Sequence, residues 1–173
     1  MNTIHKITVS YDEQEDRLHF ACEEAAGKVQ GLWLTQRLAN RLVMALFSQL
    51  DGAVAYLPDV CARETVQAWE QSAARVQLTL NPSTPVPGST VKTNGLVTSI
   101  DISQTDGNFK LVFRWPENHA AVLTLNSIVL RQWLAIVHDT YAKAEWLCAG
   151  VWPSWFETAN QTNMVNPDGV SLH

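Results

Sequence analysis

A pattern of apolar residues that occurs twice, 91 residues apart, is the feature that most constrains the fold of this chain. The stretch LWLTQRLANRLVMALFSQL, residues 32–50, is followed at that offset by LTLNSIVLRQWLAIVHDTY, residues 123–141. When residues 18–50 are shifted onto 109–141 without a gap, roughly three in four positions agree as apolar or non-apolar, against roughly half expected by chance. Two unrelated units with equal loop lengths are the alternative, but the agreement favours an internal duplication.

Each half of the chain is predicted to form three strands followed by one helix. Alternating apolar residues indicate strands, and Thr35 and Asn126 are placed to cap the two helices that follow. DEQED and QTDG are the predicted hairpin turns. The expected elements are strands at 4–11, 17–22 and 27–34 before a helix over 36–50, then strands at 96–103, 108–115 and 120–125 before a helix that begins at Ser127.

Three segments fall outside the repeat. Residues 61–76 predict a further helix, after which RVQLTL, residues 75–80, has the alternation of a short strand. NPSTPVPGSTVKTNG, residues 81–95, contains three prolines and two glycines and is typical of a linker. The tail from Trp146 to His173 begins with bulky aromatic residues and ends with polar residues that we expect to be loosely held.

These patterns predict an α+β protein built from two βββα copies, a pseudo-twofold internal repeat whose antiparallel sheets pack against helices. One copy alone buries too little apolar surface, so the two should share one compact core, with any cleft where they meet. The expected organisation is a first copy with its extra helix in residues 1–80, the linker in 81–95, a second copy in 96–145 and the Trp-rich C-terminal tail in 146–173.

The charge content bears on the partners that the protein can have. Charged residues make up 17% of the chain, below the roughly 25% of an average soluble domain. This shortage favours self-association or a bound partner protein. The net charge of −5 disfavours nucleic acid and anionic lipid as electrostatic partners. Because the chain has no long apolar run and no signal-peptide pattern at its start, we expect a cytoplasmic protein without a membrane partner.

Motifs for catalysis or for a cofactor are absent from the sequence. Cys22, Cys61 and Cys148 are widely spaced and predict buried thiols rather than a metal site. Neither a nucleophile elbow nor a phosphate-binding glycine loop occurs. His5 and His19 could meet across a hairpin as a weak metal site, but rim histidines are the favoured interpretation. The acidic turn Asp12–Asp16 could hold a cation, although a solvated hairpin turn explains it better. We therefore predict no catalytic residue, no cofactor and no metal.

Two sets of residues are candidates for a functional surface. Basic residues interleaved with an aromatic residue suit a nucleic-acid or ligand surface, although solvated arginines and core aromatics are the simpler explanation. This first set is Arg37, Arg41, Lys110, Arg114, Trp115 and Arg131. The second set is an aromatic interaction surface in the tail: Trp146, Trp152, Trp155 and Phe156.

Two resemblances add to this interpretation. YDEQEDRL, residues 11–18, followed by LWLTQRLANRL, residues 32–42, resembles a family of bacterial proteins of unknown activity over the whole chain and implies no functional residue. The order of strands and helix, repeated twice, is similar to the Whirly-type fold that binds single-stranded nucleic acid. That fold has four strands in each unit rather than three, so the likeness is one of architecture.

The function that the sequence favours is that of a non-enzymatic interaction protein, which binds itself or another protein through apolar helix faces or the tryptophan tail. A single-stranded nucleic-acid binding protein is the alternative. A small-ligand carrier or an enzyme with its pocket between the two copies is the third hypothesis.

Overall fold

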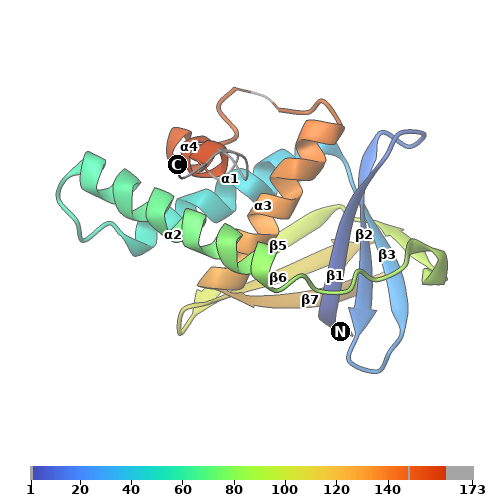
Figure 1. The fold of residues 1–173 in the computed structure, drawn as a ribbon. Coiled ribbons are helices and arrows are strands. Elements are labelled where there is room, and N and C mark those ends of the chain that lie inside the picture. Colours follow the sequence, from blue (N-terminus) through green and yellow to red (C-terminus); the bar gives the residue numbers. More distant parts are fainter. Residues whose placement is uncertain (1, 148, 163–173) are drawn as a thin grey trace.

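A computed structural model describes residues 2–147 and 149–162 and shows an α+β protein with one mixed sheet and four α-helices (Figure 1). The strands are β1 (Asn2–Asp12), β2 (Arg17–Glu24), β3 (Val29–Leu34), β4 (Asn94–Leu96), β5 (Ser99–Thr105), β6 (Asn108–Trp115) and β7 (His119–Asn126). The helices are α1 (Gln36–Ala53), α2 (Val60–Leu80), α3 (Ser127–Lys143) and α4 (Ser154–Thr162), with a short 3₁₀ turn, η1 (Gly88–Thr90). The predicted α+β class is confirmed.

The seven strands form one sheet in the order β4-β3-β2-β1-β7-β6-β5. Two antiparallel meanders, β1-β2-β3 and β5-β6-β7, supply most of it. Parallel pairing joins them, because β1 lies beside β7 and β3 lies beside β4. The expectation of purely antiparallel sheets is therefore wrong at these two junctions.

The two edges of the sheet meet where β4 is followed by β5. The backbone N–H of Val97 donates to the carbonyl of Trp33 in β3, at 2.9 Å. The next residue, Thr98, donates instead to the carbonyl of Arg114 in β6, at 2.8 Å. Within two residues the chain passes from one edge strand to the other, so the sheet curves until its two edges lie close together.

Two corrections concern the segment between the halves. Residues 75–80 continue α2 rather than forming a strand, since Val76 and Leu80 are spaced by four residues and the helix ends only when Asn81 N–H donates to Gln77 O. The predicted linker contains β4 and η1, and inside it Val86 is buried and donates its N–H to Thr8 Oγ1 at 2.8 Å. The proline-rich segment therefore packs against the sheet.

Both predicted helix caps are confirmed. Thr35 Oγ1 accepts from Leu38 N–H at 3.4 Å, and Asn126 Oδ1 accepts from Val129 N–H at 2.9 Å. Asp59 caps α2 in the same way. Each cap satisfies a backbone donor that the first turn of a helix cannot pair internally.

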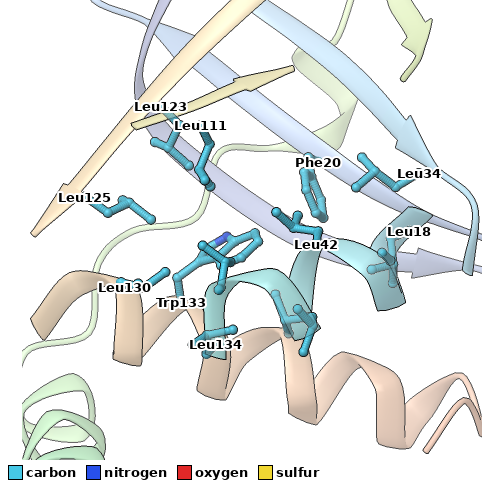
Figure 2. Packing of buried hydrophobic residues seen from close by; sticks show 14 of the residues in the cluster. Leu18, Phe20, Leu34, Leu42, Leu111, Leu123, Leu125, Leu130, Trp133 and Leu134 are labelled. Atoms are coloured by element: carbon cyan, nitrogen blue, oxygen red, sulfur yellow. The ribbon is translucent and has the colours of Figure 1, made fainter. Parts of the chain in front are cut away.

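The core lies between the sheet and the facing sides of α1 and α3 (Figure 2). Leu18, Phe20 and Leu34 project from the first meander, whereas Leu111, Leu123 and Leu125 project from the second. Trp133 of α3 packs edge-on against Phe20, with the ring centroids 5.8 Å apart. Since complete burial of a leucine or phenylalanine side chain contributes about 1.5–3 kcal/mol, this shared core holds the two meanders together.

The acidic turn is organised by its own backbone. Asp12 accepts from the N–H groups of Gln14 and Glu15, both at 3.0 Å, and Asp16 accepts from Tyr11 Oη at 2.8 Å. Within the described residues no group of three or more metal-ligating side chains occurs. His5 and His19 are not opposite one another, because His19 pairs with Ser10.

The cysteines differ in their environments. Cys22 is buried in the core, and desolvation raises the pKa of its thiol to about 12. Cys61 is exposed at the start of α2, so the prediction of three buried thiols is wrong for this residue. Cys148 and the polar end of the tail lie outside the described residues. No helix in the described part of the chain is long and apolar enough to cross a membrane.

Candidate functional site

The predicted basic surface is divided between two elements. Arg37 and Arg41 are exposed on α1, whereas Lys110 and Arg114 are exposed on β6. Arg114 Nε donates to Asp101 Oδ2 at 2.7 Å, which reduces the positive charge available there. Trp115 is only partly buried, at the end of β6. The role of these residues in binding nucleic acid or a ligand stays a prediction.

Arg131, the remaining member of that set, is enclosed between helices. Its side chain is only 3% exposed, and its guanidinium donates to Gln67 Oε1 and, at 2.5 Å, to Glu70 Oε2 of α2. Burial lowers the pKa of Arg131, while the charges of Glu70 and Asp51 oppose that shift. The ring of Trp155 lies 5.9 Å from the guanidinium carbon. The structure therefore places Arg131 at a helix–helix contact rather than on the surface.

The four aromatic residues of the predicted tail surface are also buried. Three of them gather around Phe47 of α1, whose ring meets Trp152, Trp155 and Phe156 edge-on at centroid distances of 5.2–5.7 Å. Trp146 packs on Tyr11 and Tyr141 and donates its indole N–H to Asp16 at 3.2 Å. In this structure Trp146, Trp152, Trp155 and Phe156 complete the protein's own core.

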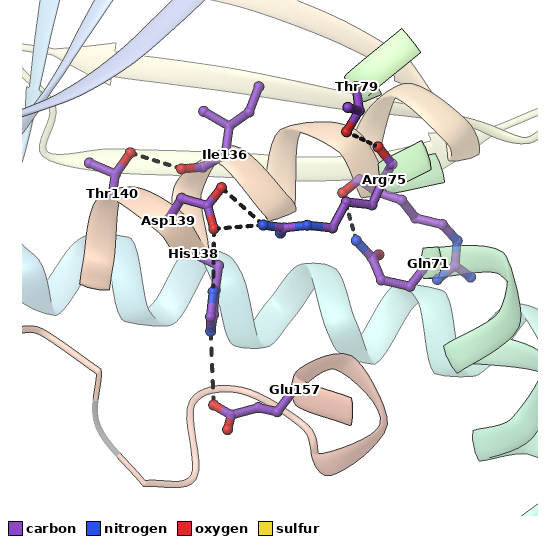
Figure 3. A network of polar contacts seen from close by, with 9 residues as sticks. Gln71, Arg75, Thr79, Ile136, His138, Asp139, Thr140 and Glu157 are labelled. Atoms are coloured by element: carbon purple, nitrogen blue, oxygen red, sulfur yellow. Dashed lines mark hydrogen bonds and ion pairs between the residues drawn. The ribbon is translucent and has the colours of Figure 1, made fainter. Parts of the chain in front are cut away.

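A polar network holds α2 against α3 (Figure 3). Gln71 Nε2 donates to the carbonyl of Arg131 at 3.0 Å, and Arg75 forms an ion pair with Asp139 at 3.2 Å. His138, next to Asp139, lies 3.9 Å from Glu157 of α4. Burial alone would raise the pKa of Asp139, but its contacts with His138 and Arg75 outweigh burial and lower it. These contacts fix which side of α2 faces inward.

The outward side of α2 is apolar. Trp69 is 74% exposed, Leu80 is 72% exposed and Val76 is 47% exposed. At about 100° per residue, they fall within an arc about 40° wide, opposite the buried side marked by Gln67, Gln71 and Ala74. Exposed tryptophan and leucine on the same helix face form the kind of apolar patch that marks a protein contact.

The α2 face, as we call it, comprises Ala62, Val66, Trp69, Ala73, Val76 and Leu80. The other residues within about 80° of Trp69 on either side are Cys61, Thr65, Ser72, Gln77 and Thr79, none of which is charged. The charges of Arg63, Glu70 and Arg75 lie about 100–120° from Trp69. Glu70 and Arg75 pair with residues of α3, and Arg63 donates to the carbonyl of Leu57. Such a face suits another uncharged protein surface rather than a phosphate backbone.

The sequence interpretation missed the α2 face. Its signal is a spacing of alternately four and three residues from Ala62 to Leu80, which is the period of a coiled-coil seam. Ending the helix at residue 76 removed Leu80 from that pattern.

In comparisons with known proteins, no family model, curated protein or solved structure matches this chain.

Proposed function

We propose that the protein is a self-associating interaction module, in which the α2 face of one copy packs against the α2 face of a second copy. The observation that carries the proposal is the uncharged stripe around Trp69, which is 74% exposed. A tryptophan so exposed costs solubility, and burial of its ring against a partner removes that cost.

The spacing of the stripe supports an antiparallel pair of helices. The six positions of the α2 face are symmetric about residue 71, so a twofold axis there places Ala62 opposite Leu80, Val66 opposite Val76, and Trp69 opposite Ala73. Each layer thus combines a large side chain with a small one, or two of medium size. Facing layers of this kind interdigitate without voids.

A second copy fits this face better than a charged partner does. No charged side chain lies along the stripe to select an acidic or basic partner, and the small residues let two helix backbones approach closely. The 21 residues of α2 span about 30 Å, so the contact is smaller than a standard protein interface. We therefore expect a dissociation constant in the micromolar range, roughly 1–100 μM.

A substitution series tests the association. Trp69→Glu places a charge in the central layer, and we expect it to raise the dissociation constant of the dimer by at least about 30-fold, or about 2 kcal/mol. Ile128→Glu, at an exposed apolar residue of α3, is the matched control and should leave the constant unchanged. Sedimentation equilibrium measures both.

An exchange of side chains tests the antiparallel register. Ala73→Trp sets two indoles against each other and should prevent dimerisation, whereas the double variant Trp69→Ala/Ala73→Trp restores one large and one small side chain in the layer. Recovery of the dimer in the double variant is the expected result. A monomeric wild-type protein at about 200 μM, or a double variant no better than Ala73→Trp, would contradict the proposal.

We also infer that the framework carrying α2 is the duplicated one that the sequence pattern predicts. The register at the two parallel junctions supports this inference. Thr3 pairs with Val122 and Ile4 with Leu123, and a shift of 91 residues turns these pairs into Asn94 with Gly31 and Gly95 with Leu32. On this interpretation α2, like α4, lies outside both copies, which agrees with its use as an added contact element.

A further inference from the structure

A cavity of about 460 Å³ lies at the end of the sheet where β3 and β4 meet the β6–β7 turn. It is independent of the α2 face, since its lining comes from strands and turns of both halves of the chain. Asn2 of β1, Gln30 of β3 and Asn94 of β4 contribute to the wall, and His119 of β7 contributes from the opposite meander. The volume is in the range of small-molecule sites.

Two glycines let the walls of the cavity approach closely. A Cβ atom on Gly31 would lie 1.9 Å from Asn94 Oδ1 and 2.5 Å from His19 Nε2. A Cβ atom on Gly95 would lie 2.6 Å from Cδ1 of Trp115. A side chain at Gly31 would have to displace Asn94 and His19, and one at Gly95 would have to displace Trp115, so glycine keeps the backbone of β3 and β4 close to these neighbours.

Side-chain amides in the wall offer hydrogen-bonding groups that the protein does not use itself. Gln30 is 4% exposed, and its amide nitrogen has no hydrogen-bond partner within the described residues. Asn94 Oδ1 lies 3.1 Å from His19 Nε2, so the Asn94 side chain is engaged on the face of β4 that it shares with Gly31. Asn2 donates to Glu24 at 2.8 Å, which leaves its carbonyl oxygen as an acceptor. A buried amide without a partner is costly unless a ligand or water pairs with it.

An aromatic pair forms the opposite wall. The rings of Trp115 and His119 are stacked at 8°, with their centroids 5.6 Å apart. His119 Nδ1 lies 2.9 Å from the carbonyl of Pro116 and therefore carries the proton that it donates there. In the neutral ring the other nitrogen, Nε2, is then an acceptor. The two rings are therefore nearly parallel, and the pair combines an aromatic surface with a ring acceptor.

From these groups we propose that the cavity binds a neutral heteroaromatic ring that carries both hydrogen-bond donors and acceptors, of which a nucleobase is the type. Amides of both polarities match the edge of such a ring, and the aromatic wall matches its plane. Lys28 and Glu117, the two charged residues of the lining, balance each other and favour a neutral group over a phosphate. The ring can belong to a free nucleoside or to an unpaired base of a strand.

Titration with the four ribonucleosides, followed by the indole ¹H–¹⁵N signals of the tryptophans, tests the site. Trp115→Phe identifies the signal of Trp115. We expect a nucleoside to move that signal while the Trp69 signal stays in place. Gln30→Leu and Asn2→Ala should each raise the dissociation constant fivefold or more, whereas Gln77→Leu, on the exposed side of α2, should leave it unchanged. Unmoved indole signals elsewhere show that the variants are folded.

A single-stranded octanucleotide at low and high salt distinguishes the two sources of the ring. Tighter binding of the octanucleotide than of the nucleoside, with little dependence on salt, assigns the site to a base of a strand. Binding of the nucleoside alone assigns it to a free nucleoside. Two results together overturn the proposal. The first is that no nucleoside at about 20 mM moves the Trp115 signal. The second is that the octanucleotide does not bind, or that its binding falls steeply with salt, as phosphate recognition requires. The proposal is also overturned if neither amide variant weakens binding.

Discussion

Arg131 shows how far a single residue can be interpreted from sequence. Its position on the polar arc of α3 was predictable, because helical periodicity identifies the face on which a residue lies. Whether that face meets water depends on α2, which brings Gln67 and Glu70 to the guanidinium. Periodicity carries no information on this second helix, so a buried charge was interpreted as a surface charge. The same limit applies to Trp155, which packs beside it.

Removal of the carboxylate that pairs with Arg131 should destabilise the protein. Glu70→Ala leaves a guanidinium that is 3% exposed without its counter-charge, and we expect a loss of about 2–4 kcal/mol in the free energy of unfolding. Glu64→Ala, on the exposed part of the same helix, is the control and should change it by about 0.5 kcal/mol or less. Urea denaturation monitored by circular dichroism measures both. Equal effects of the two substitutions would show that the buried ion pair does not stabilise the contact.

At the scale of elements, local signals were the reliable ones. Thr35 and Asn126 predicted where α1 and α3 begin, because a capping side chain satisfies backbone donors in its own helix. The predicted end of α2 was wrong, because the spacing of Val76, Leu78 and Leu80 fits both a strand and a helix. Arg75, which precedes Val76, pairs with Asp139, 64 residues away. Tertiary contacts of this kind decide between helix and strand where the local pattern fits both.

The two caps provide a prediction at this scale. Thr35→Ala and Asn126→Ala each remove an acceptor for a first-turn N–H, and each should lower the free energy of unfolding by about 1 kcal/mol. Because the caps lie on separate helices, the double variant should lose the sum of the two within about 0.5 kcal/mol. Thr124→Ala, exposed in the strand before α3, is the control, and thermal denaturation provides the comparison. A cap variant no less stable than Thr124→Ala would contradict the assignment.

At the scale of the whole molecule, the two meanders and their helices were predictable and the way they join was not. A hairpin is predictable because its two strands and its turn are adjacent in the sequence. The pairing of Ile4 with Leu123, or of Leu32 with Gly95, joins segments that are far apart in the sequence. The strand β4 has only three residues, which is too few for a periodic signal. The α2 face was not predicted, since it needs the full length of α2. A cleft between the two halves was expected, but the residues that line the cavity depend on both parallel junctions.

The central claim, that two copies pair through antiparallel α2 helices, is tested most directly by a distance between spin labels. A nitroxide on Thr79→Cys, with Cys61 and Cys148 replaced by serine, lies eight residues from the proposed axis at residue 71. Pulsed electron paramagnetic resonance on the concentrated protein should then give a separation of about 25 Å between copies. A distance of about 15 Å or less would indicate a parallel pair. That result, or the absence of any dipolar modulation at concentrations well above the expected dissociation constant, would contradict the account.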